Sequence, residues 1–79
     1  MPENYTARQG QFLAFIYYYT KIQGRPPAEA EMQRYFRLSA PSVHATVLKL
    51  EQLGLIAREP QSARSIRLLV SRNEIPDLE

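Results

Sequence analysis

Apolar side chains recur every three or four positions over the first third of the chain, which is the spacing of a helix with one buried face. The stripe consists of Phe12, Phe15 or Ile16, Tyr19 and Ile22, with Leu13 beside it. Before it, Thr6-Ala7-Arg8-Gln9 has the form of a capping box, in which a hydroxyl and a glutamine side chain bind free backbone amides. Gly24 readily adopts the left-handed conformation that ends a helix. These signals predict a helix from Thr6 to about Gln23.

Two shorter helices are predicted after a proline break. Arg25-Pro26-Pro27 disfavours helical backbone angles, so a new helix is expected only over residues 28–36. Its buried side consists of Met32, Tyr35 and Phe36. Ser39 is a favourable N-cap for a third helix, predicted over residues 39–53 and ended by Gly54. The residues of this helix expected to face the core are Val43, Val47 and Leu50.

After Gly54 the apolar period changes from helical to alternating, which is typical of strands. Residues 55–58 and 65–70 are predicted to pair as a hairpin around the loop 59–64, which we call the wing. Three helices followed by a hairpin are the order of a winged helix-turn-helix, so the predicted fold is mainly α with a small β-hairpin. The expected segments are an N-terminal arm (1–5), the folded domain (6–70) and an acidic C-terminal tail (71–79).

Composition excludes several classes of protein. The 79 residues suffice for one domain, and 44% apolar residues argue against disorder. The chain has no cysteine and a single histidine, His44, so neither disulfides nor a metal site are expected. No apolar stretch approaches the roughly 20 residues that cross a bilayer, and no secretory leader is visible. We expect a cytoplasmic protein with no membrane association, no cofactor, no small-molecule ligand and no catalytic constellation.

Charge is distributed unevenly along the chain, although the net charge is only +2. Residues 32–72 carry seven basic side chains against two acidic ones, Glu51 and Glu59. Most of the basic residues are arginine, whose planar fork suits phosphates and base edges. Ordinary surface solvation is the alternative explanation, and charge alone does not decide between the two.

The outward side of the third helix favours DNA binding. It offers small or polar groups and no acid until Glu51 on its flank: Pro41, Ser42, His44, Ala45, Lys49 and Gln52. A helix that enters the major groove needs such a surface, because bulky side chains block approach and phosphates repel carboxylates. Arg64 lies in the wing, with Arg58 and Arg67 on the flanking strands. The hydroxyl and free amides at Ser39 can also bind a phosphate.

Several segments resemble the DNA-binding domain of LexA-type repressors over roughly residues 6–70. They are Thr6-Ala7-Arg8-Gln9, Gly24-Arg25-Pro26-Pro27, Ala30-Glu31-Met32, Ser39-Ala40-Pro41-Ser42, Gly54-Leu55-Ile56 and Ala63-Arg64-Ser65-Ile66-Arg67-Leu68-Leu69. The resemblance implies a sequence-preferring, double-stranded-DNA-binding transcriptional regulator, specifically a repressor. By this resemblance, base contacts are expected from Ser42, His44, Ala45 and Thr46, and backbone contacts from Lys49 and Arg64.

Some positions depart from the family pattern. Ala28 replaces the hydroxyl residue that usually caps the second helix, and Pro60-Gln61 stands where relatives often have Pro-Gly. The third helix is one residue shorter than in LexA, so an operator sequence cannot be transferred. The third helix looks more like that of the small stand-alone relatives of this domain. We see no room for the family's Ser-Lys protease half, and self-cleavage is therefore not expected.

A second class of function stays open at this point. Winged helices also serve as protein-interaction modules, and the acidic tail would suit that role. Tyr17, Tyr18 and Tyr19 cannot all face the core at about 100° per residue, so part of this aromatic surface could form a homodimer through the first helix. The simpler alternative is that the rings cover the domain's edge with their hydroxyls in water.

Overall fold

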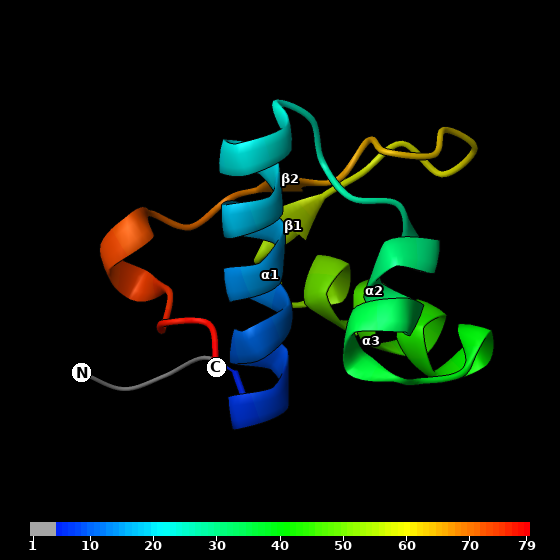
Figure 1. The fold of residues 1–79 in the computed structure, drawn as a ribbon, viewed down its shortest axis with the longest axis horizontal. Coiled ribbons are helices and arrows are strands. Elements are labelled where there is room, and N and C mark those ends of the chain that lie inside the picture. The colour runs from blue at the N-terminus through cyan, green and yellow to red at the C-terminus, as the bar shows by residue number, and fades with distance from the viewer. Residues whose placement is uncertain (1–4) are drawn as a thin grey trace.

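The computed structural model describes residues 5–79, so most of the expected N-terminal arm lies outside the described residues. Three helices precede a small antiparallel sheet, and a 3-10 turn follows it (Figure 1). The elements are α1 (Ala7–Gln23), α2 (Glu29–Phe36), α3 (Ala40–Gln52), β1 (Ile56–Ala57), β2 (Arg67–Leu68) and η1 (Arg72–Glu74). This order confirms the predicted winged helix-turn-helix. Within the described residues, no helix combines the length and apolar character needed to cross a membrane.

Local capping interactions fix the ends of α1 as the sequence predicts. The Thr6 hydroxyl accepts a hydrogen bond from the Gln9 backbone amide at 3.1 Å, and the Gln9 side-chain oxygen accepts one from the Thr6 backbone amide at 2.9 Å. Gly24 ends the helix in the left-handed region at φ 77°. α3 likewise begins at its predicted cap, where the Ser39 hydroxyl accepts the Ser42 amide at 3.3 Å.

α2 forms although its N-cap, Ala28, has no side-chain acceptor. The Glu31 carboxylate accepts the Ala28 amide at 2.6 Å, which supplies one half of a capping box. A charged acceptor at a helix N-terminus also interacts favourably with the helix dipole. Glu31 thus partly replaces the missing hydroxyl cap.

The core lies between α1, the helix pair α2–α3 and the sheet. Fully or almost fully buried side chains from these elements include Phe12, Leu13, Ile16, Met32, Val43, Val47, Leu50, Ile56 and Ile66. The inward face predicted for α3 is confirmed. Two expectations were wrong, because Ile22 is 75% exposed and Tyr35 is 45% exposed. Ile22 lies in the last turn of α1, which extends beyond α2 and α3 (Figure 1), whereas the Tyr35 ring packs at the edge of the core against Phe15.

The sheet is shorter than predicted. Only two residue pairs are in register, Ile56 with Leu68 and Ala57 with Arg67. Beyond them, the Ser65 hydroxyl accepts the Glu59 amide at 2.9 Å, so a side chain takes the place of a ladder partner. Arg64 has a left-handed φ of 60°, which interrupts extended pairing. The hairpin is therefore mostly loop.

The C-terminal segment folds back onto the domain, a feature that its polar sequence did not indicate. Ile75 is only 5% exposed and joins the core. Gln11 of α1 donates to the Asp77 carbonyl at 3.0 Å and accepts the Glu79 amide at 2.8 Å. η1 lies on the side of α1 that faces away from α2 and α3 (Figure 1), whereas the Glu79 carbonyl at the end of the segment accepts a hydrogen bond from Tyr35 of α2 at 2.8 Å. The outward side of α3 is left uncovered.

Candidate nucleic-acid interface

The inward face of α3 determines which residues face outward. Because Val43, Val47 and Leu50 are fully buried, the opposite side of the helix lies in solvent. Most predicted contact residues of α3 are exposed: Ser39, Ser42, His44, Ala45 and Lys49. Thr46 is half-buried, and its hydroxyl donates to the Ser42 carbonyl at 3.1 Å. The predicted residues of α3 other than Thr46 are therefore accessible to solvent.

Ser39 and Ser42 are hydrogen-bonded to each other at the start of α3. The Ser39 hydroxyl donates to the Ser42 hydroxyl at 3.0 Å while it accepts the Ser42 amide. The cap thereby fixes the first turn of the helix and orients the Ser42 side chain. A first turn that is already ordered loses little conformational entropy when it meets a ligand.

His44 has an acidic neighbour that the sequence analysis missed. Its Nδ1 lies 3.2 Å from both carboxylate oxygens of Glu29, at the N-terminus of α2. The two side chains are 51% and 30% exposed. No short-range sequence signal indicates this contact, because the residues are fifteen positions apart and meet only through the packing of α2 on α3.

Arg58 is held at the base of the wing. Its Nε donates to Glu51 of α3 at 3.1 Å, and its side chain is only 14% exposed. This contact joins the last turn of α3 to the residue that follows β1. Most of the Arg58 side chain is therefore covered within the domain.

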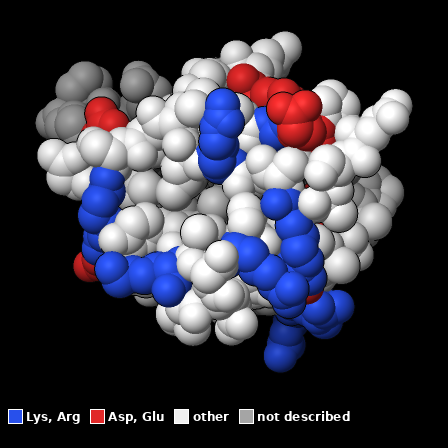
Figure 2. Space-filling model, turned by 90° about the horizontal axis from the view of Figure 1, so that it is seen from above, with Lys and Arg blue, Asp and Glu red and all other residues white. Residues whose placement is uncertain are grey.

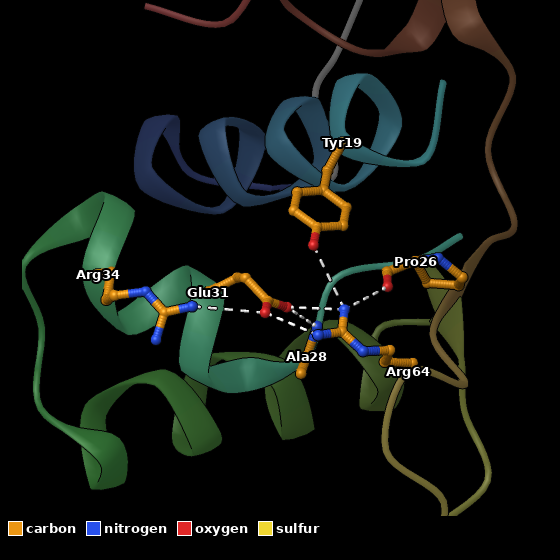
Figure 3. A network of polar contacts seen from close by, with 6 residues as sticks. All are labelled: Tyr19, Pro26, Ala28, Glu31, Arg34 and Arg64. Atoms are coloured by element: carbon orange, nitrogen blue, oxygen red, sulfur yellow. Dashed lines mark hydrogen bonds and ion pairs between the residues drawn. The ribbon is translucent and has the colours of Figure 1, made fainter. Parts of the chain in front are cut away.

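Arg64 is the centre of a network that connects four parts of the chain (Figure 3). Its Nη1 and Nη2 donate to the two oxygens of Glu31 at 2.9 and 2.8 Å. Nη1 also lies within hydrogen-bonding distance of the Pro26 carbonyl at 3.3 Å and the Tyr19 hydroxyl at 3.4 Å. The Arg64 side chain is 31% exposed and that of Glu31 is 17% exposed. Sequence analysis predicted Arg64 as a phosphate contact and did not identify Glu31 or Tyr19 as its partners.

The protonation of this pair is shifted toward the charged forms. The hydrogen bonds from Arg64 lower the pKa of Glu31, against the opposing effect of its partial burial. The same interaction raises the pKa of Arg64. Both groups are therefore charged at neutral pH, and the contact is a charge-assisted, two-point pair.

A surface hollow separates most of the wing from the helices. It encloses about 420 Å³ and is lined by Pro60 and Ser62 on the wing side and by Ala28, Glu29 and His44 on the helix side. Arg64 contributes to its wall. The wing therefore does not rest directly on the helices along its length.

Arg67 and Lys49 differ from Arg58 and Arg64 in that both are exposed. Figure 2 looks onto the side of the molecule that carries the C-terminal end of α1 and the hairpin, and it shows basic side chains spread across this side, with acidic side chains mainly at the upper edge of the view. A surface with this distribution of charge attracts a polyanion more strongly than a neutral surface does.

Comparison with known proteins agrees with this geometry. The model of the LexA DNA binding domain family matches residues 2–65. The chain is 38% identical to the LexA repressor of Thermosipho africanus (strain TCF52B) over 64 residues, which are 81% of this chain and 32% of that protein. It is 38% identical to the LexA repressor of Cellvibrio japonicus (strain Ueda107) over 74 residues, 92% of this chain and 37% of that protein.

The chain thus spans about a third of the length of the curated relatives it matches. The LexA repressor of Enterococcus faecalis (strain ATCC 700802 / V583) shows the same relation, with 39% identity over 62 residues, 77% of this chain and 30% of that protein. The matched part is the N-terminal part of these relatives. The resemblance derived from the sequence is confirmed: this chain belongs to the LexA DNA binding domain family.

Proposed function

We propose that this protein binds double-stranded DNA with α3 in the major groove and the wing along the flanking backbone, and that it acts as a transcriptional repressor. One observation carries the proposal: the side of α3 opposite Val43 and Val47 is exposed and not covered by the C-terminal segment. Family membership and the repressor relatives support the same conclusion. The proposal assigns the chain no catalytic step, and a chromosomal target would place it in the cytoplasm.

The proposed contacts divide into two kinds. Ser42, His44, Ala45 and Thr46 read base edges, since the first three are exposed near the start of α3 and the half-buried Thr46 lies next to Ser42. Lys49, Arg67 and the start of α3 at Ser39 bind phosphates, which position the domain without reading sequence. Direct DNA contacts by Arg58 and Arg64 stay predictions, because both guanidinium groups already have partners within the domain.

The proposal is tested by measuring duplex affinity as a function of salt. Lys49→Ala should weaken binding to all duplexes and lower the slope of log K against log salt by about 0.9, the value for one phosphate contact. Arg8→Ala, at the start of α1 beside Pro76 and Glu79 of the C-terminal segment, removes the same charge outside the proposed interface and should leave the slope nearly unchanged. If both variants behave alike, α3 is not the binding surface.

Sequence reading is tested separately. Binding sites are selected from a random duplex pool with the wild-type protein and with Ser42→Ala. The substitution should change base preference at one position while the salt slope stays the same. Identical preferences for the two proteins would remove Ser42 from the reading residues.

A protein-interaction role is a second candidate, supported by the exposure of Ile22 on α1. The nearby tyrosines support it less, because Tyr18 accepts a hydrogen bond from Arg72 at 2.7 Å and the Arg72 guanidinium lies 5.1 Å from the centre of the Tyr17 ring. A homodimer through α1 should appear in sedimentation as a concentration-dependent rise in mass. Ile22→Arg should abolish that rise.

A further inference from the structure

The wing has few fixed attachments to the rest of the domain. The strands that flank it pair over only two residues each, and a hollow lies between its tip and the helices. Arg64, at the end of the wing, reaches across to α2, the α1–α2 connection and α1 (Figure 3). One end of the wing adjoins Arg58, which is bound to Glu51 of α3. At the other end, the position of the wing relative to the helices depends strongly on Arg64.

We infer that Glu31 and Arg64 are positioning residues for DNA binding: their ion pair holds the wing at a fixed angle to α3 before DNA arrives. This inference rests on the proposed function and deepens it. It gives Arg64 a role different from the phosphate contact that the sequence suggested, and it gives Glu31, an acid near a DNA-binding surface, a favourable role.

The geometry of the pair supports a positioning role. Two parallel hydrogen bonds between a guanidinium and a carboxylate fix orientation as well as distance, which a single contact does not. Glu31 is itself fixed, because its Oε1 also accepts the Ala28 amide at 2.6 Å at the start of α2. Arg64 is additionally constrained by its left-handed backbone. The wing is thus tied to the same helix that packs against α3.

The cost of ordering the wing explains why the pair should affect affinity. A loop that is mobile in the free protein must lose backbone entropy on binding, about 1–2 kcal/mol for each residue that becomes fixed. A loop that is already held in place has lost that entropy during folding. Breaking the pair should therefore weaken DNA binding even when no DNA contact is removed.

Glu31→Gln separates the two possible roles of Arg64, because they predict opposite changes in DNA affinity. Glutamine can still accept the Ala28 amide and so preserve the helix cap, but it loses the second acceptor and the charge that hold Arg64. If Arg64 acts through the ion pair, DNA affinity should fall about five-fold. If Arg64 instead binds phosphate, its release and the loss of one negative charge should tighten binding and steepen the salt dependence.

Glu59→Gln is the matched control. Glu59 is an exposed acid in the wing, and its substitution removes the same charge near the same surface. It should leave affinity unchanged or slightly increase it. A second variant, Arg64→Lys, keeps the positive charge but cannot form the two-point contact, and it should weaken binding as much as Glu31→Gln does.

Wing mobility in the free protein provides a readout that does not depend on DNA. In nuclear magnetic resonance relaxation, the amides of Gln61, Ser62 and Ala63 should have order parameters of about 0.85 in the wild type. These values should fall to about 0.6 in Glu31→Gln and Arg64→Lys. The amides of α1 and α3 should not change. Unchanged wing order in both variants would overturn the inference.

The two measurements distinguish failure of this inference from failure of the proposed function. If the wild type binds no duplex, the proposed function is wrong, and the mobility data alone decide whether the pair holds the wing. If the wild type binds DNA but Glu31→Gln binds as tightly as Glu59→Gln or more tightly, the positioning role is wrong. Weaker binding together with a mobile wing supports it.

Discussion

The charged side chains beside α3 divide into those with partners in the domain and those exposed to solvent. Arg58 and Arg64 each contact an acidic side chain. Lys49 and Arg67 are exposed. The exposed cations can neutralise DNA phosphates and so release the counterions condensed on them, whereas the paired cations fix the relative positions of helices and wing. A count of positive charges along the sequence treats these two groups alike.

The Glu31 carboxylate should make stability depend on pH. Its pKa lies below the ordinary value of 4.5 in the folded state because Arg64 and Ala28 donate to it. As pH falls, Glu31 therefore takes up a proton in the unfolded chain before it does so in the folded protein. Its contribution to the free energy of unfolding is complete above about pH 5 and is lost as pH falls through the lowered pKa. In urea unfolding from pH 7 to pH 3, the free energy of unfolding of the wild type should exceed that of Glu31→Gln by less and less as pH falls. A difference in free energy that does not change with pH would show that Glu31 does not cause this pH dependence.

Helix ends determine much of the geometry of the recognition unit. α1 and α3 have hydroxyl caps, whereas α2 depends on Glu31 to bind the Ala28 amide. The same carboxylate thus stabilises the start of α2 and holds the wing through Arg64. One side chain couples the integrity of a helix to the placement of a loop.

Restoring the missing cap should stabilise the protein. Ala28 has the extended backbone angles of an N-cap, φ −83° and ψ 164°, and it borders the hollow, so a serine hydroxyl has room. Ala28→Ser should raise the free energy of unfolding by about 1 kcal/mol, because its hydroxyl can accept the amide of Glu31.

Thr6→Ala provides the converse control for that substitution. It removes the side-chain acceptor from the cap of α1 and should lower the free energy of unfolding by a similar amount, about 1 kcal/mol. Urea unfolding measures both variants. If Ala28→Ser is neutral while Thr6→Ala is destabilising, Glu31 already satisfies the start of α2 fully.

Across the molecule, the C-terminal segment is part of the folded domain. Ile75 enters the core, and Gly10 of α1 lies so close to Tyr5 and Pro76 that an added Cβ would be only 2.8 Å from the Tyr5 ring. The segment contacts α1 and the edge of α2 and leaves α3 open. The C-terminal segment and the exposed face of α3 proposed to bind DNA thus lie on different sides of the protein.

Substitution of Ile75 tests this separation. Ile75→Ala should lower the free energy of unfolding by about 2–4 kcal/mol, because it removes a side chain that is 5% exposed. The same change at Ile22, which is 75% exposed, should cost less than about 0.5 kcal/mol. Under conditions where Ile75→Ala is fully folded, its DNA affinity should equal that of the wild type. Reduced affinity of the folded variant would show that the two sides are coupled.

Prediction from sequence succeeded for features that depend on residues close together along the chain. The cap at Thr6, the stop at Gly24 and the inward face of α3 were all predicted and are confirmed. Ile22 and Tyr35 were wrongly placed, because periodicity identifies a helix face but not where the packing against that face ends. Ile75 was missed because a single apolar residue in a short polar segment has no period to detect.

The sequence by itself therefore determined the helices, their order and the open side of α3, since capping and periodicity act within one or two turns of the chain. Only the tertiary structure decided the partners of the charged residues. Glu31 and Arg64 are 33 positions apart, and Glu29 and His44 are 15 apart. Their distances depend on how helices and wing pack together, and local sequence rules do not describe that packing.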